Sequence, residues 1–98
     1  MGIVSFHNTG TEDIFDGAST KAARRTCPQS LWAVTRRKLD QLNTVGRLGD
    51  LRFPPSNRLE ALKGDRKGQH SIRINDQYRI CFTWTDTGPA DVEIVDYH

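Results

Sequence analysis

Residues 71–85, SIRINDQYRICFTWT, predict a β-hairpin at the centre of the fold. Side chains alternate between the two faces of a strand, so Ile72 and Ile74 point to one face and Ser71 to the other. The second strand repeats the alternation with the apolar set Ile80, Phe82 and Trp84. The two apolar sets share a face only if the loop has an odd number of residues, such as Asn75-Asp76-Gln77.

This register places Arg73 directly opposite Arg79, on the face that does not line the core. Like charges that face one another destabilise a sheet. The sheet either tolerates this cost or binds an anion between the two arginines, and we favour the interpretation that it binds an anion. The pair is the sharpest functional clue that the residue pattern gives by itself.

The residues before the hairpin predict a short first strand and two helices. Ile3-Val4-Ser5-Phe6 is typical of a strand. Thr9–Glu12 has the features of a helix start, and the helix ends at Gly17. Ser19-Thr20-Lys21 opens a connecting segment that we expect to be partly helical.

The second predicted helix begins at Pro28. Proline suits the first helical position, because the backbone N–H that it lacks would have no intrahelical partner there. It runs to about Thr44 and stops at Gly46. At 100° per residue its apolar side chains form one broad stripe: Leu31, Trp32, Val34, Leu39, Leu42 and Val45. Lys38 falls inside this stripe, so either its side chain extends from the edge of the stripe or the helical register is shifted.

The remaining segments predict further strands and turns. Residues 46–57 are loop-like because they contain Pro54-Pro55. Leu59–Leu62 and Asp91–Val95 predict strands, and Gly64–Gly68 predicts a turn. The whole pattern indicates an α+β fold, with two N-terminal helices packed on a mostly antiparallel twisted sheet.

The length of 98 residues indicates a single domain, residues 1–98. The start of the chain lacks a basic stretch followed by a long apolar one, so we expect no secretory signal, no membrane segment and a cytoplasmic location. Cys27 and Cys81 form no metal-ligand cluster, and we expect both to be reduced thiols.

Charge is unevenly distributed although its formal sum is only +2. Residues 21–38 carry six basic residues and no acid, and residues 47–79 carry eight basic and four acidic residues. Residues 1–20 and 80–98 carry no Lys or Arg. Basic blocks of this kind can form a surface suited to phosphates, or can be solvated charge.

Several kinds of site are excluded by the sequence. The histidines, His7, His70 and His98, are not at metal-ligand spacing with another His or Cys, so we expect no metal and no cofactor. No nucleotide-binding glycine motif and no nucleophile elbow is present. What remains is a set of basic and proton-transferring residues: Lys63, Arg66, Lys67, His70, Arg73, Arg79, Asp96, Tyr97 and His98.

This set suits metal-independent RNA cleavage. A base removes the ribose 2′-OH proton, the oxygen attacks the adjacent phosphorus, and an acid protonates the leaving 5′-oxygen. Lys and Arg can stabilise the developing charge, His can move protons near neutral pH, and Tyr can stack on a base.

Three motifs resemble the HigB toxins of the RelE/ParE superfamily. They are Leu-Lys-Gly-Asp-Arg at 62–66, Tyr-Arg-Ile at 78–80 and Asp-Tyr-His at 96–98. The resemblance covers essentially the whole chain. It implies the toxin of a type II toxin–antitoxin system, with the microbial RNase fold of RelE, that cuts messenger RNA in the ribosomal A site. It also implies a HigA-type helix-turn-helix antitoxin, through which the complex would bind operator DNA.

The resemblance also implies roles for single residues. Lys63 and Arg79 match the active-site lysine and the phosphate-contacting arginine, so we expect both to stabilise charge. Asp96, Tyr97 and His98 match the terminal trio, with His98 the expected general acid and Tyr97 a stacking or orienting group. Asp96 either orients His98 or takes part in proton removal, and the identity of the general base stays open. We expect the RNA contacts to come from Arg66, Lys67, His70 and Arg73.

One position departs from the family pattern. Some members place a histidine three residues before the lysine, and here that residue is Glu60. This protein must therefore work without that histidine or use the carboxylate in its place. His70 could compensate, although a strand-edge role suits it better.

Two other functions remain open on the sequence. A ParE-like toxin of the same superfamily would block DNA gyrase by binding alone, and a regulatory module would bind RNA without cutting it. The pair Tyr97-His98 with Lys63 favours the nuclease, because a binding module needs no proton-transfer groups. Four further arginines form either a second ribosome-binding face or the solvated side of the helices: Arg24, Arg25, Arg36 and Arg37.

Overall fold

The computed structural model of the chain describes residues 2–97. The predicted hairpin lies at the centre of its sheet: β2 (His70–Arg73) pairs antiparallel with β3 (Tyr78–Thr85), and Arg73 stands opposite Arg79. The predicted register is therefore confirmed. The Asn75 side chain accepts hydrogen bonds from the backbone N–H groups of Gln77 and Tyr78, which closes the loop.

Two more strands complete a four-stranded antiparallel sheet in the order β1-β2-β3-β4. β1 (Glu60–Ala61) is a two-residue edge strand beside β2. β4 (Gly88–Asp96) pairs with β3 along the other side and includes the predicted last strand. The pairing of β3 with β4 is interrupted between Cys81 and Thr83.

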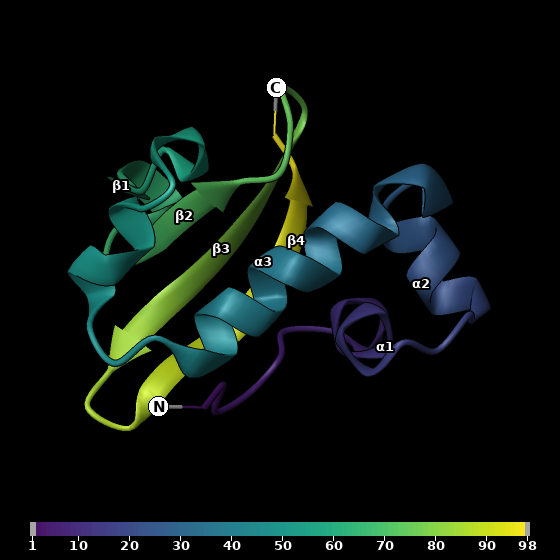
Figure 1. Cartoon of the computed structure of the whole chain (residues 1–98), viewed down its shortest axis with the longest axis horizontal. Helices are drawn as coiled ribbons and strands as arrows, with labels where there is room; N and C mark the ends of the chain where they lie inside the picture. Colours follow the sequence, from purple (N-terminus) through teal and green to yellow (C-terminus); the bar gives the residue numbers. More distant parts are fainter. Residues whose placement is uncertain (1, 98) are drawn as a thin grey trace.

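Three α-helices lie on one face of the sheet or beside it: α1 (Thr9–Asp16), α2 (Lys21–Thr26) and α3 (Trp32–Thr44). In Figure 1, α3 crosses in front of β3 and β4. The two predicted helices are α1 and α3, and α2 is the helical part of the connecting segment. The Asn8 side chain caps α1, which ends at Gly17 in the left-handed conformation.

The core lies between the sheet and the helices. Sheet residues Ile72, Ile80 and Phe82 are fully buried against Ile14 of α1 and the Leu39 and Leu42 side chains of α3. The predicted stripe of α3 faces this core, with Trp32 also buried and Leu31, Val34 and Val45 packed against the cluster. Below, the face that carries Ile72 and Ile80 is called the core face, and the face that carries Arg73 and Arg79 the arginine face.

Lys38 extends from the edge of the α3 stripe, which is one of the two arrangements expected for it. Its Nζ donates a hydrogen bond to Oδ1 of the fully buried Asn57. Burial, with a smaller contribution from Arg37, lowers the pKa of Lys38 below its usual value.

Two sequence predictions were wrong in detail. Ile3–Phe6 is an extended segment with one parallel bridge to β4, from Phe6 to Val92, and not a strand. The backbone at Asp91 is left-handed with φ 54°, and its N–H binds the Ser5 hydroxyl, so a regular ladder cannot form there.

The start of the long helix is the second correction. Pro28 is extended (φ −56°, ψ 140°) and precedes a 3₁₀ turn, η1 (Gln29–Leu31), so that α3 begins only at Trp32. The Pro28 carbonyl accepts a hydrogen bond from the N–H of Leu31, which suits a residue in front of a helix.

The predicted loop 46–57 contains two 3₁₀ helices, η2 (Leu48–Arg52) and η3 (Pro55–Asn57). Asn57 holds them together, since its amide donates to the carbonyls of Leu51 and Phe53 and to the Gln41 side chain. A further 3₁₀ turn, η4 (Gly64–Arg66), follows β1. No helix within residues 2–97 has the length and apolar character needed to cross a membrane.

Candidate phosphate-binding site

A row of polar residues crosses the arginine face from one edge of the sheet to the other. Glu60 stands opposite Ser71, Ser71 opposite Cys81, and Cys81 opposite Glu93. Directly paired residues point to the same face. Ser71 and Cys81 are fully buried in the middle of this row, while the two carboxylates at its ends each pair with an arginine.

Arg79 is the most enclosed arginine of this face, with only 14% of its side chain exposed. Its Nη1 lies 3.2 Å from a Glu60 carboxylate oxygen, and its Nη2 donates to the Arg58 carbonyl at 2.8 Å. The Nε–H is buried and has no hydrogen-bond partner among residues 2–97. A guanidinium N–H left in this state is ready for an acceptor that enters from outside.

A shallow pocket of about 280 Å³ opens beside Arg79. Arg58, Arg73 and Arg79 line it together with Asn75, Asp76 and Tyr97. Arg73 forms an ion pair with Asp76 at the rim. Three guanidinium groups around one pocket suit a phosphate, because each presents several N–H donors in a planar fork.

Arg58 is a site residue that the sequence did not indicate. It follows η3 with a left-handed backbone, φ 46°, and its carbonyl holds Arg79. The Asn57 contacts determine the path of the chain at this point, and they depend on residues far away in the sequence. No local pattern could have found Arg58.

Tyr97 covers one side of the pocket. Its ring centre lies 5.7 Å from the guanidinium carbon of Arg79, within the range of a cation–π contact. Its backbone N–H donates to the Gln77 carbonyl, and Asp96 accepts hydrogen bonds from the Gln77 side chain. The β2–β3 loop therefore fixes Asp96 and Tyr97 beside the arginines. His98 lies outside the described residues.

Lys63 and Lys67 flank η4 and are both exposed. Neither lines the arginine pocket. Both side chains project from the η4 turn that follows β1, so they could contact only a ligand long enough to extend from the pocket to that turn.

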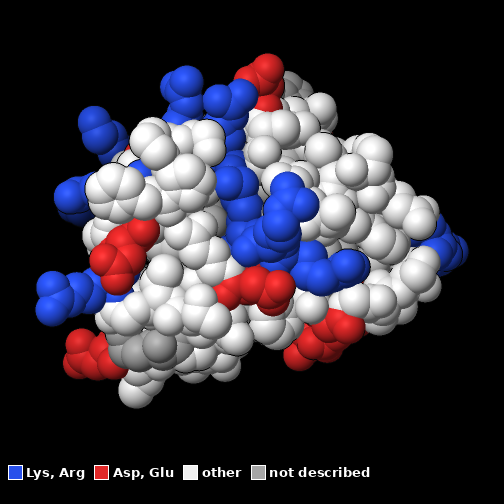
Figure 2. All heavy atoms as spheres, viewed as in Figure 1, with Lys and Arg blue, Asp and Glu red and all other residues white. Residues whose placement is uncertain are grey.

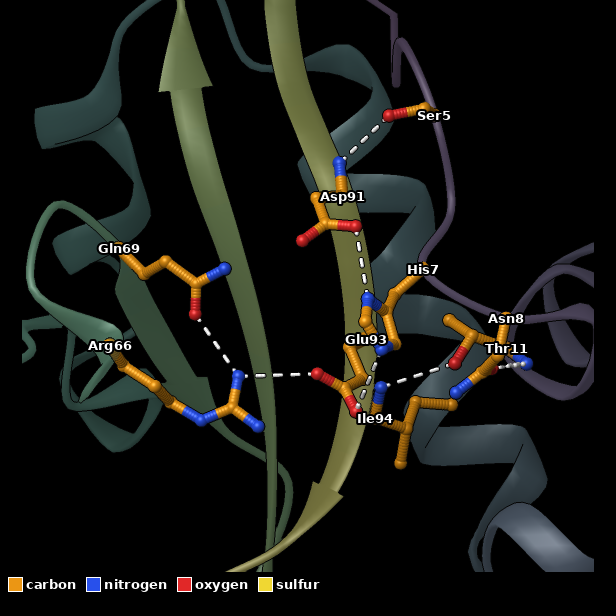
Figure 3. Close-up of polar contacts among 9 residues, drawn as sticks. All are labelled: Ser5, His7, Asn8, Thr11, Arg66, Gln69, Asp91, Glu93 and Ile94. Atoms are coloured by element: carbon orange, nitrogen blue, oxygen red, sulfur yellow. Dashed lines mark hydrogen bonds and ion pairs between the residues drawn. The ribbon is translucent and has the colours of Figure 1, made fainter.

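Arg66 lies in a separate polar network that Figure 3 shows in full. Its Nη1 contacts Glu93 at 3.2 Å and the Gln69 side chain at 3.0 Å. Glu93 also lies 3.8 Å from the His7 ring, which contacts Asp91 at 3.1 Å. The network links the N-terminal segment to β4 and η4, and it balances the charge of Arg66.

The structure separates His70 from the other predicted RNA-binding residues. His70 pairs with Phe82 on the core face, with the two ring centres 6.3 Å apart. It lines a different pocket, of about 220 Å³, with Arg52, Leu48 and Leu59. Arg73 and Arg79 point to the opposite face of the sheet.

Both cysteines are free thiols in buried positions. Burial is the largest cause that raises the pKa of Cys81, which lies among the charges of Arg66, Glu93, Arg79 and Glu60. Burial likewise raises the pKa of Cys27. Neither thiol has the character of a nucleophile. Among residues 2–97, no group of three or more His, Cys, Asp or Glu side chains is placed to hold a metal ion.

A second basic surface lies on the opposite side of the molecule. Figure 2 shows Lys and Arg side chains gathered over the middle of α3, which contributes Arg36, Arg37 and Lys38. Arg36 is partly held within the fold, since its Nε donates to the Ile14 carbonyl.

The chain matches one protein family over almost its full length. The model of the HigB-like toxins, described as the RelE-like toxin of type II toxin–antitoxin system HigB, matches residues 4–98. Toxin HigB-1 of Vibrio cholerae is 47% identical over 62 residues, 63% of this chain and 65% of that protein. An uncharacterized protein of Haemophilus influenzae is 40% identical over 57 residues, 58% of this chain and 56% of that protein. The chain thus covers less than two thirds of the length of these relatives.

Solved structures share the fold at low identity. The YoeB–YefM toxin–antitoxin complex of Staphylococcus aureus has a chain with a TM-score of 0.53 at 16% identity, covering 100% of this chain and 99% of that one. The YoeB/ParE toxin of Agrobacterium tumefaciens has a TM-score of 0.54 at 20% identity, covering 100% of both chains.

Proposed function

Since the chain belongs to the HigB-like family of RelE-like toxins of type II toxin–antitoxin systems, we propose that it is a ribosome-dependent endoribonuclease. It cuts messenger RNA in the ribosomal A site and thereby inhibits translation in the cytoplasm. The observation that carries the proposal is the pocket of Arg58, Arg73 and Arg79 beside Tyr97, which suits a nucleotide phosphate with a base next to it.

The reaction needs no metal ion. A base removes the proton of the ribose 2′-OH, the O2′–P bond forms, and the P–O5′ bond breaks. Protonation of O5′ by an acid then leaves a cyclic phosphate and a 5′-hydroxyl end.

The family motif or the place of a residue at the pocket suggests a role for each of the following residues, and the general base is not assigned. Arg79 stabilises the charge on the phosphorus centre, and Lys63 contributes charge from the edge of the site. His98 acts as the general acid, Asp96 orients it, and Tyr97 stacks on a base. Arg58 and Arg73 hold the RNA backbone, and Lys67 contacts ribosomal or messenger RNA. Arg66 contributes less, because it does not line the pocket and its charge is paired with Glu93.

The partners that we propose are those that the family resemblance suggests. A HigA-type antitoxin neutralises the toxin and carries the complex to operator DNA. The structural neighbour from Staphylococcus aureus is a toxin bound to an antitoxin, which supports a partner of this kind.

The test is primer extension on a defined messenger RNA, with purified ribosomes stalled at a known codon. The wild type should produce cuts in the A-site codon, and His98→Ala should abolish them. Arg47→Ala is the control for removal of a basic side chain elsewhere on the surface, since Arg47 is exposed and does not line the pocket. Absence of wild-type cuts with persistent growth inhibition would instead indicate gyrase inhibition or RNA binding without cleavage.

A further inference from the structure

The charge of Arg79 is already paired with a carboxylate of the protein. Glu60 reaches from β1 across β2 to place its Oε1 3.2 Å from Nη1 of Arg79 on β3. The two side chains differ in exposure: 14% of Arg79 and 50% of Glu60 are accessible to solvent. The carboxylate can therefore move into water, while the arginine stays where it is.

The arginine itself is held without help from Glu60. The Arg58 carbonyl accepts from Nη2 at 2.8 Å, and the Tyr97 ring lies against the guanidinium. A phosphate binds a guanidinium best through two parallel N–H···O bonds. An incoming phosphate must share the guanidinium with a second negative charge as long as Glu60 remains in place.

We propose that Glu60 is an internal competitor for the phosphate at Arg79, so that RNA binding replaces one ion pair by another. The inference rests on the proposed function and deepens it. Free RNA gains little from an exchange of equal charges. A message held on the ribosome presents its phosphate at high effective concentration, which favours the exchange. Glu60 thus makes the site selective for RNA that is already positioned.

A supporting role for Glu60 predicts the opposite sign. If the carboxylate served to orient Arg79, its removal would weaken anion binding. If it competes, its removal strengthens anion binding. Glu60→Gln separates the two roles, because the amide oxygen can still accept from Arg79 while the charge is lost. Glu60 is half exposed on a two-residue edge strand, so the variant should fold.

The first experiment titrates the isolated protein with inorganic phosphate and follows the Nε–H resonance of Arg79 by NMR, assigned with Arg79→Lys. We expect Glu60→Gln to bind phosphate about threefold to fivefold more tightly than the wild type, the upper part of the range for a partly exposed ion pair. Asp65→Asn removes the same charge from the exposed η4 turn and should change the affinity less than twofold. Equal or weaker binding by Glu60→Gln, or an equal gain in Asp65→Asn, overturns the proposal.

The second experiment compares cleavage of free single-stranded RNA with cleavage on programmed ribosomes. Glu60→Gln should raise the rate on free RNA several-fold and so reduce the preference for ribosome-bound message. An unchanged preference overturns the proposal. The phosphate titration does not depend on cleavage. A wild-type protein that never cuts on the ribosome would therefore refute the proposed nuclease function, while the phosphate titration would still test the role of Glu60.

Discussion

Arg79 contacts three different groups of the protein: the Glu60 carboxylate, the Arg58 carbonyl and the Tyr97 ring. Arg79→Ala should lower the rate of A-site cleavage about a hundredfold to a thousandfold, as expected for loss of a preorganised donor to the reacting phosphate. Arg79→Lys should retain only part of the wild-type cleavage rate, because an ammonium group lacks the planar fork of N–H donors. Single-turnover cleavage on programmed ribosomes measures both, and a rate for Arg79→Ala within threefold of wild type would refute the assignment.

Tyr97 could act through its aromatic ring or through its hydroxyl group, and substitutions distinguish the two contributions. Tyr97→Phe keeps the surface that faces Arg79 and should cut within about threefold of wild type. Tyr97→Ala should lose about tenfold or more, the usual contribution of one stacked base. The same ribosome assay applies, and Tyr97→Phe as damaging as Tyr97→Ala would show that the hydroxyl matters instead.

Strand alternation and loop parity are enough to place Arg73 opposite Arg79 from the sequence alone. The same alternation puts His70 on the face of Ile72, so its separation from the arginines is also present in the sequence. The ion pair of Glu60 with Arg79 could not be predicted from the sequence, because it joins β1 to β3 across an intervening strand. Contacts of that range depend on the path of the whole loop 46–58.

The helical layer depends on one close approach between α1 and α2. A Cβ at Gly10 would lie 1.9 Å from the Thr26 hydroxyl and 2.6 Å from the Ala22 carbonyl oxygen. Gly10→Ala should therefore force the helices apart and lower the free energy of unfolding by about 2 kcal/mol. Urea denaturation measures this.

Gly46→Ala is the matched control, because nothing lies within 4 Å of a Cβ built at Gly46. It should change the free energy of unfolding by less than about 0.5 kcal/mol. Equal effects of the two substitutions would show that the contact with α2 does not decide the outcome at Gly10.

At the level of elements, start and stop signals predicted α1, while periodicity predicted the body of α3 and the central strands, because these have a regular apolar pattern that faces the core. Segment 46–57 shows why the irregular parts of the fold could not be predicted from the sequence. Its apolar and proline residues follow no period, and its two 3₁₀ helices are held by Asn57, Lys38 and Gln41. A polar residue at the centre of such a network is chosen by tertiary contacts.

The buried thiols link stability of the whole molecule to pH. Folding raises the pKa of Cys27 and Cys81 above the ordinary value of 9.0, so the unfolded chain loses these protons first as pH rises. Their contribution is fully present below pH 9 and is lost as pH rises toward the folded-state values. The urea midpoint should hence fall as pH rises above about 9.

The variant Cys27→Ala with Cys81→Ala is the control, since it should show a smaller fall in the urea midpoint. A thiol reagent at pH 8 should label native wild type slowly and unfolded wild type at once. Rapid labelling of the native protein would contradict the burial of both thiols.

The charge balance of the whole molecule predicts poor activity on free RNA. The formal net charge is only +2, and three arginines of the arginine face are paired with acids: Arg66 with Glu93, Arg73 with Asp76, and Arg79 with Glu60. A strand that approaches from solution meets arginines whose charge is already balanced, so electrostatic attraction, the usual source of affinity for nucleic acid, is weak. We expect the isolated protein to cut free RNA about a hundredfold more slowly than the same message on the ribosome, which orients it. The rate on free RNA should be unchanged by a metal chelator, since Arg, Tyr and His side chains supply the chemistry. Efficient cleavage of free RNA by the wild type would mean that the paired arginines open without help, and the ribosome would then serve only to bring the substrate near.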